Sequence, residues 1–276
     1  MKRLLFICLL LWSYSATADH FVGPGYSAYK PNYIVLGPIV SDPVFPEQGG
    51  DDGEIHFQVS FKIQPFVNGV GWFEKLRFAY SQRSFWIVGC CSSPFRETNY
   101  NPELFFDTTT VDWLYKRRSN VEYGLRQISL YEHQSNGRED DSDLSRGWDR
   151  VGNMDFYFRN GDWSAGLKYE PSATTSSPGN VDMVDYFGRN ELYFKYETIP
   201  LLAGASFRKG RLANTSRYEL ELGYQLFGEK DKPGSMLYVK YWNGVGESLM
   251  EYDKKTSRFM IGFLLSRDME RFNNHD

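Results

Sequence analysis

The dominant pattern along this chain is alternation of apolar and polar residues. In residues 54–63, every second side chain from Ile55 to Ile63 is aromatic or aliphatic, and the side chains between them are polar. Residues 217–226 repeat the pattern, with two carboxylates facing away from an apolar stripe. A period of two places the apolar side chains on one face of an extended strand. Both segments therefore predict β-strands.

Weaker alternation predicts further strands, and long helical patterns are absent from the sequence. The further segments are 75–88, 100–113, 121–134, 149–159, 162–170, 185–197, 200–208, 235–246 and 257–266. Single-chain bacterial membrane barrels normally have an even number of strands, so we add residues 32–40, with Pro38 at the end of the strand or at a bulge. The chain is thus expected to contain twelve strands.

Two fold classes share this period, the soluble β-sandwich and the transmembrane β-barrel. Strands of about ten residues, with one face strongly apolar and the other charged, favour the barrel. Tyr or Trp residues near several strand ends would lie at the bilayer interfaces. We therefore predict an all-β fold, a twelve-stranded antiparallel transmembrane β-barrel over residues 19–276, with a short periplasmic tail at about 19–31.

An export signal precedes the predicted barrel. Lys2 and Arg3 are followed by a short apolar run and by small residues that end at Ala18, a pattern typical of a cleaved secretory signal peptide over residues 1–18. No later apolar run reaches the about 18 residues that indicate a membrane helix, which excludes a helical membrane protein. The mature chain keeps Cys90 and Cys91, which are neighbours and are expected near the barrel rim, not in a disulfide scaffold.

Composition and charge agree with a barrel. Hydrophobic residues make up only 41% of the chain, yet aromatic residues make up 17%. An outward apolar band around a polar interior explains this combination, because half of each strand is polar. The formal charge of −4 leaves no basic surplus for a nucleic-acid partner.

Candidate chemistry is concentrated at the end of the segment 121–134. At a period of two, His133 and Ser135 point to the same side, and a serine becomes a nucleophile when a base lies beside it. A His-x-Ser triplet is frequent by chance, so the pair alone also fits a polar turn. The polar loop 139–150 then returns to Asp149, whose carboxylate could hold the imidazole.

Four segments resemble, in the same order, motifs of the bacterial outer membrane phospholipase A family. They are S-S-P-F-R-E-T-N-Y at 92–100, H-Q-S-N-G-R at 133–138, S-R-G-W-D-R at 145–150 and G-E-S-L-M-E-Y at 246–252. The resemblance implies a twelve-stranded outer membrane barrel that hydrolyses acyl esters of phospholipids, requires Ca²⁺ and acts as a homodimer.

The same resemblance implies roles for four residues. Ser135 is the nucleophile, His133 is the general base, and Asp149 occupies the third, orienting position. Family members commonly carry Asn at that position, so Asp149 makes a Ser-His-Asp set and gives the imidazolium a charged partner. Gly137 would offer a backbone N–H to the oxyanion, a contribution of about 10²–10³ in rate.

A calcium site beside the serine is also implied by the resemblance. Its ligands correspond to the backbone oxygen of Arg138, to Ser145 and to Ser92 of the partner subunit. A shift of the match by one residue would make Ser93 the third ligand instead of Ser92. The loop between Arg138 and Ser145 is longer than is usual in the family. It carries three aspartates, Asp140, Asp141 and Asp143. We hypothesise that one of them supplements the ligands, because hard cations prefer oxygen.

Strand parity bears on where the site faces. Side chains that share the parity of His133 are apolar in the lower half of its strand, which suggests that the serine faces lipid, but Ile128 and Leu130 interrupt this pattern. Asn153 shares the parity of Asp149, and only a bulge would separate the two onto different faces.

Gln82 lies on an otherwise aromatic, lipid-facing stripe. By the resemblance, it pairs with its own copy across the two-fold axis of a dimer. A position at headgroup depth explains the amide equally well.

The sequence thus predicts a calcium-dependent phospholipase A of the bacterial outer membrane. It would act on outer-leaflet phospholipids and lysophospholipids through a serine acyl-enzyme, with its active site at the extracellular leaflet and with activation by dimerisation. A non-catalytic barrel, such as a pore or a structural protein, is the alternative, and a soluble all-β binding protein is a more distant one. The preferred acyl position is left open.

Overall fold

The structure, a computed structural model, describes seven stretches of the chain: 25–37, 53–66, 71–88, 95–139, 144–175, 180–226 and 234–267. Several predicted features lie outside these stretches, namely the signal peptide 1–18, Pro38, Cys90, Cys91, Ser92, Ser93, Asp140, Asp141 and Asp143. Within the described stretches, no helix is long and apolar enough to cross a membrane.

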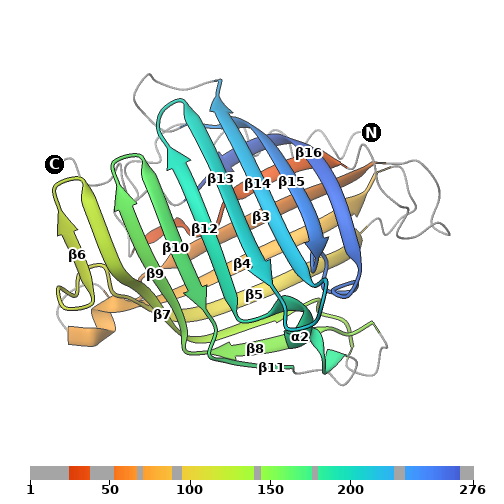
Figure 1. The fold of residues 1–276 in the computed structure, drawn as a ribbon, viewed down its shortest axis with the longest axis horizontal. Coiled ribbons are helices and arrows are strands. Elements are labelled where there is room, and N and C mark those ends of the chain that lie inside the picture. The colour runs from red at the N-terminus through yellow and green to blue at the C-terminus, as the bar shows by residue number, and fades with distance from the viewer. Residues whose placement is uncertain are drawn as a thin grey trace.

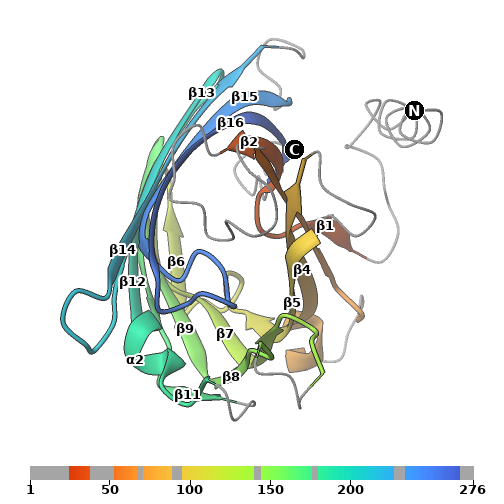
Figure 2. The same cartoon turned by 90° about the vertical axis from the view of Figure 1, so that its right-hand side faces the viewer.

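Twelve antiparallel strands close into a barrel, which confirms the predicted fold (Figures 1 and 2). Each strand pairs with the next along the chain, and β16 pairs with β2 to complete the ring. The strands are β2 (Asn32–Gly37), β3 (Glu54–Ile63), β4 (Leu76–Ile87), β5 (Phe95–Asp107), β7 (Val121–Ser135), β8 (Gly147–Val151) continued by β9 (Asn153–Asn160), β10 (Trp163–Tyr169), β12 (Asn190–Glu197), β13 (Leu201–Lys209), β14 (Ser216–Gln225), β15 (Met236–Val245) and β16 (Lys255–Ser266).

Shorter elements extend this ring at its rims. The strand β1 (Tyr26–Ala28) pairs with β3, β6 (Tyr115–Arg118) pairs with β7, and β11 (Ser172–Thr175) pairs with β8. A single-turn 3₁₀ helix, η2 (Gly71–Lys75), precedes β4, and a short helix, α2 (Met183–Phe187), precedes β12. In Figure 1, β8, β11 and α2 gather at one rim of the barrel.

The predicted segments match the strands, with two differences in their bounds. The segment predicted at 100–113 begins earlier as β5 and ends at Asp107, after which the backbone N–H of Val111 donates to Thr108 O at 2.9 Å in a turn. The segment predicted at 185–197 starts instead with α2. Gly188 ends that helix at φ 70°, where a Cβ would lie 2.0 Å from Lys209 O, so only glycine fits between helix and strand.

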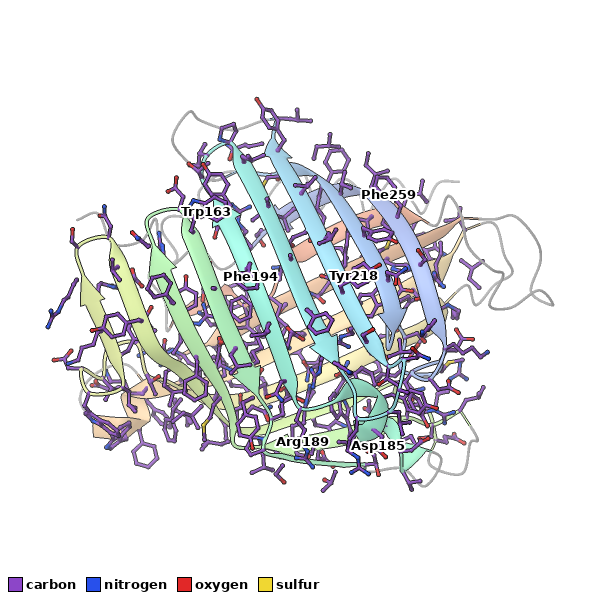
Figure 3. The ribbon with its side chains drawn as sticks, in the orientation of Figure 1. Trp163, Asp185, Arg189, Phe194, Tyr218 and Phe259 are labelled. Carbon is purple, nitrogen blue, oxygen red and sulfur yellow. The ribbon has the colours of Figure 1, made fainter. Side chains whose placement is uncertain are left out.

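Apolar side chains cover the outside of the barrel and charged side chains fill its lumen. Phe194, Tyr218 and Phe259 are 58%, 40% and 47% exposed, and Figure 3 shows them on the outer surface. The neighbour of Tyr218, Glu219, points inward, where its Oε1 lies 3.0 Å from the Nζ of Lys240. This division explains how a chain with so many aromatic residues is polar on average.

Two bulges in β7 decide which residues face lipid near the predicted site. Between β5 and β7 the register shifts so that Leu130 is the extra residue, and between β7 and β9 it shifts at Arg126. A bulge changes the face on which the following residues point. Ser129 is therefore buried in the lumen whereas Tyr131, two residues later, is 46% exposed on the outside.

On the neighbouring strand, the break at Gly152 likewise changes the face to which the following residues point. Gly152 has φ 75°, which separates β8 from β9, and its N–H donates to Ser129 O at 2.9 Å. Asp149 consequently faces outward while Asn153, with the same parity, is 8% exposed and donates to Glu132 Oε2 at 2.9 Å in the lumen. The bulges thus account for the interrupted parity in the sequence.

Candidate active site

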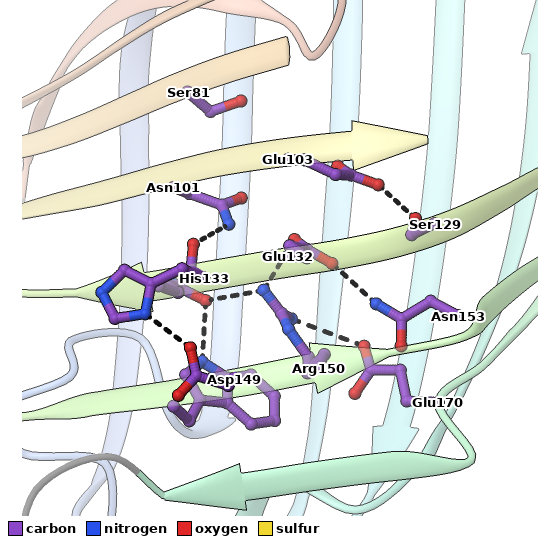
Figure 4. Close-up of polar contacts among 12 residues, drawn as sticks. Ser81, Asn101, Glu103, Ser129, Glu132, His133, Asp149, Arg150, Asn153 and Glu170 are labelled. Atoms are coloured by element: carbon purple, nitrogen blue, oxygen red, sulfur yellow. Dashed lines mark hydrogen bonds and ion pairs between the residues drawn. The ribbon is translucent and has the colours of Figure 1, made fainter. Parts of the chain in front are cut away.

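His133 and Asp149 are direct cross-strand partners on β7 and β8. Their side chains meet on the outer face, with His133 Nδ1 2.8 Å from Asp149 Oδ1 (Figure 4). The two side chains are 29% and 24% exposed. A directly opposed pair in an antiparallel ladder has Cβ atoms only about 5 Å apart, so the strand register itself produces this contact.

Ser135 extends the same outer face by two residues. It is opposite Gly147 on β8 and Tyr100 on β5, and it is partly exposed. Within the part of the chain that the structure describes, no hydrogen bond joins the side chains of His133 and Ser135. Hydrogen bonds of this kind are commonly long before substrate binds and shorten in the complex. The structure thus brings the three residues onto one face, with the histidine oriented by the carboxylate.

The backbone of His133 is held from the lumen side. The amide of Asn101 donates to His133 O at 2.7 Å and accepts a hydrogen bond from Lys30 Nζ at 2.6 Å. Next to His133, Glu132 points into the lumen and pairs with Arg150 at 2.6 Å (Figure 4). Because these charged groups are buried and paired, they fix β7 and β8 to each other directly behind the histidine and the aspartate.

Asn136 closes the loop that follows the serine. Its side chain is 6% exposed, donates to Leu144 O at 2.8 Å and accepts from the backbone N–H of Arg146 at 3.0 Å. The closed loop brings two predicted calcium ligands together, since Ser145 Oγ donates to Arg138 O at 3.4 Å. Two hard oxygens at this separation suit a cation that binds oxygens at about 2.3–2.6 Å. Among the described residues, no cluster of three or more His, Cys, Asp or Glu side chains could hold a metal.

Gly137 follows directly and cannot be replaced without strain. Its φ is +65°, and a Cβ would lie 2.6 Å from Cε2 of Tyr100. Glycine is therefore required both by the backbone conformation and by the aromatic ring packed against it. The role of its N–H toward an oxyanion stays a prediction.

Glu97 is a structural residue of the site that sequence reasoning missed. It is 3% exposed, and its Oε1 accepts the backbone N–H groups of Leu249 and Met250 at 3.0 and 3.1 Å, while its Oε2 accepts from the hydroxyl of Ser248. Glu97 shares the parity of Asn99 and Asn101, which are buried in the lumen, and the extra residue of the adjoining bulge is Arg96. The motifs at 92–100 and 246–252 were recognised separately, and the sequence carries no signal that one anchors the other.

A buried apolar cluster joins this anchored loop to β8. Trp148, beside Asp149, is 1% exposed and packs in a cluster with Met183, Phe187, Leu249 and Tyr252. The tryptophan ring stacks on Phe187 of α2 with ring centroids 5.0 Å apart. Burial and a hydrogen bond to Asp182 raise the pKa of Tyr252, which keeps this loop residue neutral. Trp148 thus faces inward and holds the strand while Asp149 faces outward.

Replacing Glu97 with alanine is expected to destabilise the barrel mouth. The buried N–H groups of Leu249 and Met250 would lose their acceptor, which should lower the free energy of unfolding by about 3 kcal/mol. Glu97→Gln keeps an acceptor oxygen and should cost less. The temperature at which the unboiled band is lost on a gel measures the effect. Equal unfolding temperatures for wild type and Glu97→Ala would refute the anchoring role.

Gln82 has hydrogen-bond partners on its own strand. Tyr80 donates to Gln82 Oε1 at 3.0 Å, and Gln82 Nε2 donates to Ser84 Oγ at 3.4 Å. These bonds reduce the cost of an amide on the apolar outer face. Pairing of Gln82 across a dimer axis stays a prediction.

Comparison with known proteins places this geometry in a family. Residues 25–265 match the family model for phospholipase A1. Phospholipase A1 of Proteus vulgaris is 32% identical over 221 residues, which cover 77% of this chain and 70% of that protein. Phospholipase A1 of Escherichia coli K12 is 30% identical over 218 residues, with the same coverage of 77% and 70%.

Solved structures of this family have the same fold. Outer membrane phospholipase A from Escherichia coli superimposes with a TM-score of 0.68 at 26% identity, over 87% of this chain and 94% of that one. The Salmonella typhi outer membrane phospholipase, solved as a dimer with bound calcium, gives a TM-score of 0.68 at 24% identity, over 93% and 97% of the two chains. This chain therefore belongs to the phospholipase A1 family and is an outer membrane β-barrel phospholipase.

Proposed function

We propose that this phospholipase hydrolyses acyl esters of outer-leaflet phospholipids and lysophospholipids through a Ser135 acyl-enzyme, with calcium, in a homodimer. The observation that carries the proposal is the 2.8 Å contact between His133 Nδ1 and Asp149 Oδ1 on the same outward face as Ser135. An outward-facing site receives lipid laterally from the membrane, without passage through the charged lumen.

The proposed reaction has two halves. Because Asp149 engages Nδ1 of His133, Nε2 is the ring nitrogen that takes the proton as Ser135 Oγ attacks the acyl carbonyl. The imidazolium then gives this proton to the leaving alcohol oxygen, which releases the lysolipid and leaves the acyl group on Ser135. Water, activated by the same imidazole, cleaves the acyl-enzyme and releases the fatty acid. The Asp149 carboxylate stabilises the imidazolium in both halves.

Calcium would be held by Arg138 O and Ser145 Oγ, with Ser92 of the partner subunit as the third ligand. A bound divalent cation polarises the ester carbonyl and neutralises the developing oxyanion. The backbone N–H of Gly137 would donate to the same oxygen. Dimerisation would supply the partner's ligand, and the aromatic outer face around Gln82 is the proposed contact surface.

The site is proposed to lie at the extracellular leaflet. Outer membrane barrels have short periplasmic turns and longer extracellular loops. The site is at the end of the barrel that carries the connections 136–146 and 170–189. The two shortest connections between barrel strands, 161–162 and 198–200, are at the opposite end, together with 64–75, 108–120 and 226–235. We also propose that residues 1–18 are a signal peptide that directs export, followed by the single barrel domain.

The test of this proposal is fatty-acid release from phospholipid in detergent micelles by the full-length mature protein, with calcium and with a chelator. We expect release in calcium and a loss of about 100-fold or more in chelator, because a Lewis-acid contact contributes several kcal/mol. Release that is the same under both conditions would overturn the calcium requirement. Absence of any release above the Ser135→Ala background would favour a non-catalytic barrel.

Loosening the loop that contains Arg138 and Ser145 is expected to lower the affinity for calcium. Asn136→Ala removes the two side-chain hydrogen bonds across the loop and leaves only the backbone bond from Asn136 N–H to Arg146 O, so Arg138 O and Ser145 Oγ would be held together less firmly. We expect the calcium concentration for half-maximal activity to rise about tenfold, the equivalent of about 1.4 kcal/mol. Asn160→Ala, at the opposite end of β9, is the control and should leave that concentration unchanged. An unchanged value in Asn136→Ala would contradict the role of the loop.

A further inference from the structure

Two donors converge on one oxygen of the Asp149 carboxylate. The phenol of Tyr131 donates to Asp149 Oδ1 at 2.6 Å, and His133 Nδ1 lies 2.8 Å from the same atom. Tyr131 reaches this position because the bulge at Leu130 turns it outward beside His133. In a regular strand, Tyr131 would point into the lumen, as Ser129 does.

We propose that Tyr131 is a positioning residue that acts on His133 through Asp149. The proposal rests on the proposed hydrolytic function and adds a fourth side chain to the Ser135, His133 and Asp149 set. The tyrosine hydroxyl holds the carboxylate in the orientation that receives Nδ1–H, and it withdraws charge from the oxygen that faces the imidazole.

The physical reason is the charge of this third residue. A carboxylate stabilises an imidazolium more strongly than a neutral amide does, which would keep the general base protonated, and therefore inactive, up to a higher pH. A hydrogen bond to Oδ1 shares the negative charge and moderates this effect. Tyr131 thereby preserves the contact that orients His133. At the same time it leaves more of the histidine unprotonated and able to act as the general base.

Other ionisable side chains near His133 lie on three strands and in one loop. Tyr100 of β5 shares the outer face and is opposite Ser135. Glu132 of β7 and Arg150 of β8 point into the lumen and pair with each other at 2.6 Å. Arg138, in the loop after the serine, extends its guanidinium to Arg96 O at 3.3 Å. Among the residues that the structure describes, Tyr131 is thus the ionisable side chain that donates a hydrogen bond to the His133–Asp149 pair.

Tyr131 is also an exposed aromatic residue on the membrane face, and such residues commonly anchor barrels at the interface. An anchoring role would change how the enzyme meets lipid, but it would not depend on the charge at position 149. Tyr123 provides a matched control, since it lies on the same strand and is 43% exposed, against 46% for Tyr131.

The experiment measures kcat and KM against pH for the purified full-length mature protein with micellar lysophospholipid and calcium. Four proteins form a cycle: wild type, Tyr131→Phe, Asp149→Asn and the double variant. We expect Tyr131→Phe to move the acidic limb of kcat/KM to higher pH by about half a unit to one unit, which is about 0.7–1.4 kcal/mol. In the Asp149→Asn background the limb should not move, because the amide carries no charge to moderate.

The outcomes separate this inference from the function on which it rests. The positioning role would be overturned if the acidic limb of kcat/KM stayed in place in Tyr131→Phe. It would also be overturned if this limb moved equally in the wild-type and Asp149→Asn backgrounds. A rise in KM without a shift of the limb indicates membrane anchoring and overturns it as well. Tyr123→Phe should reproduce the wild-type profile. If wild type is no more active than Ser135→Ala at any pH, the proposed hydrolytic function itself fails.

Discussion

Ser135→Ala is expected to reduce fatty-acid release by about 10⁴-fold or more, to the background of the assay. The loss is this large because the acyl-enzyme cannot form without the hydroxyl, and the histidine then has no proton to take from the nucleophile. The barrel itself should be unaffected, because Ser135 is at the end of β7 and is only partly buried. The rate is measured on phospholipid micelles in calcium, and folding is checked by the band shift between unboiled and boiled samples.

Ser257→Ala is the matched control for this substitution. Ser257 is also an exposed serine near the start of β16, at the same end of the barrel, and it contacts Tyr241 at 3.1 Å. Its replacement should leave the rate within about twofold of wild type, because a surface substitution of this kind changes little. Activity retained in a folded Ser135→Ala protein would show that another residue is the nucleophile.

Asp149→Ala is expected to reduce kcat by about 10²–10³-fold, whereas Asp149→Asn should retain most of the activity. Alanine removes the acceptor at 2.8 Å from His133 Nδ1, so the ring loses both its orientation and its tautomer preference. Asparagine keeps an oxygen that can accept from Nδ1, and the resemblance to the phospholipase A family implies that Asn serves at this position. The measurement is kcat in calcium at the pH of maximal activity for each protein.

KM provides the internal check on this series. Asp149 is on β8 and acts on the histidine, so its removal should lower kcat with little change in KM. Thr174, its cross-strand partner on β11, is exposed and serves as a control, since Thr174→Ala should leave kcat close to wild type. Equal activity of Asp149→Ala and Asp149→Asn would show that the residue does not orient His133.

Alternation in the sequence was sufficient for eleven of the twelve barrel strands, and the even number of strands in such barrels added β2. On β3 and β14 the polar and apolar faces are regular, and the strands begin and end within a residue of the predicted segments. The reason is physical, since each strand of a closed barrel separates lipid from a polar lumen and must repeat that separation residue by residue. Predicted strand is replaced at two places. Gly188, at positive φ, ends helix α2, and a backbone hydrogen bond closes the turn after Asp107.

Sequence reasoning proposed the members of the candidate site but not the contacts that support them. His133, Ser135 and Asp149 were found from their spacing and from the motifs, and the register of β7 and β8 places the histidine beside the aspartate. Asn136 could have been suspected from its place in the motif at 133–138. Its hydrogen bonds to the far side of the loop could not, because they join Asn136 to residues eight and ten positions later in the chain, which only the fold brings beside it.

The sequence by itself determined the period of the strands, the polar lumen, and which residues share a face within each regular stretch. The tertiary structure alone decided where that regularity fails. The bulges at Leu130 and Arg126 and the break at Gly152 turn Tyr131, His133 and Asp149 outward while Glu132 and Asn153 stay inside. A bulge is defined by two residues opposing one across a pair of strands, so its position depends on the partner strand and not on the local sequence.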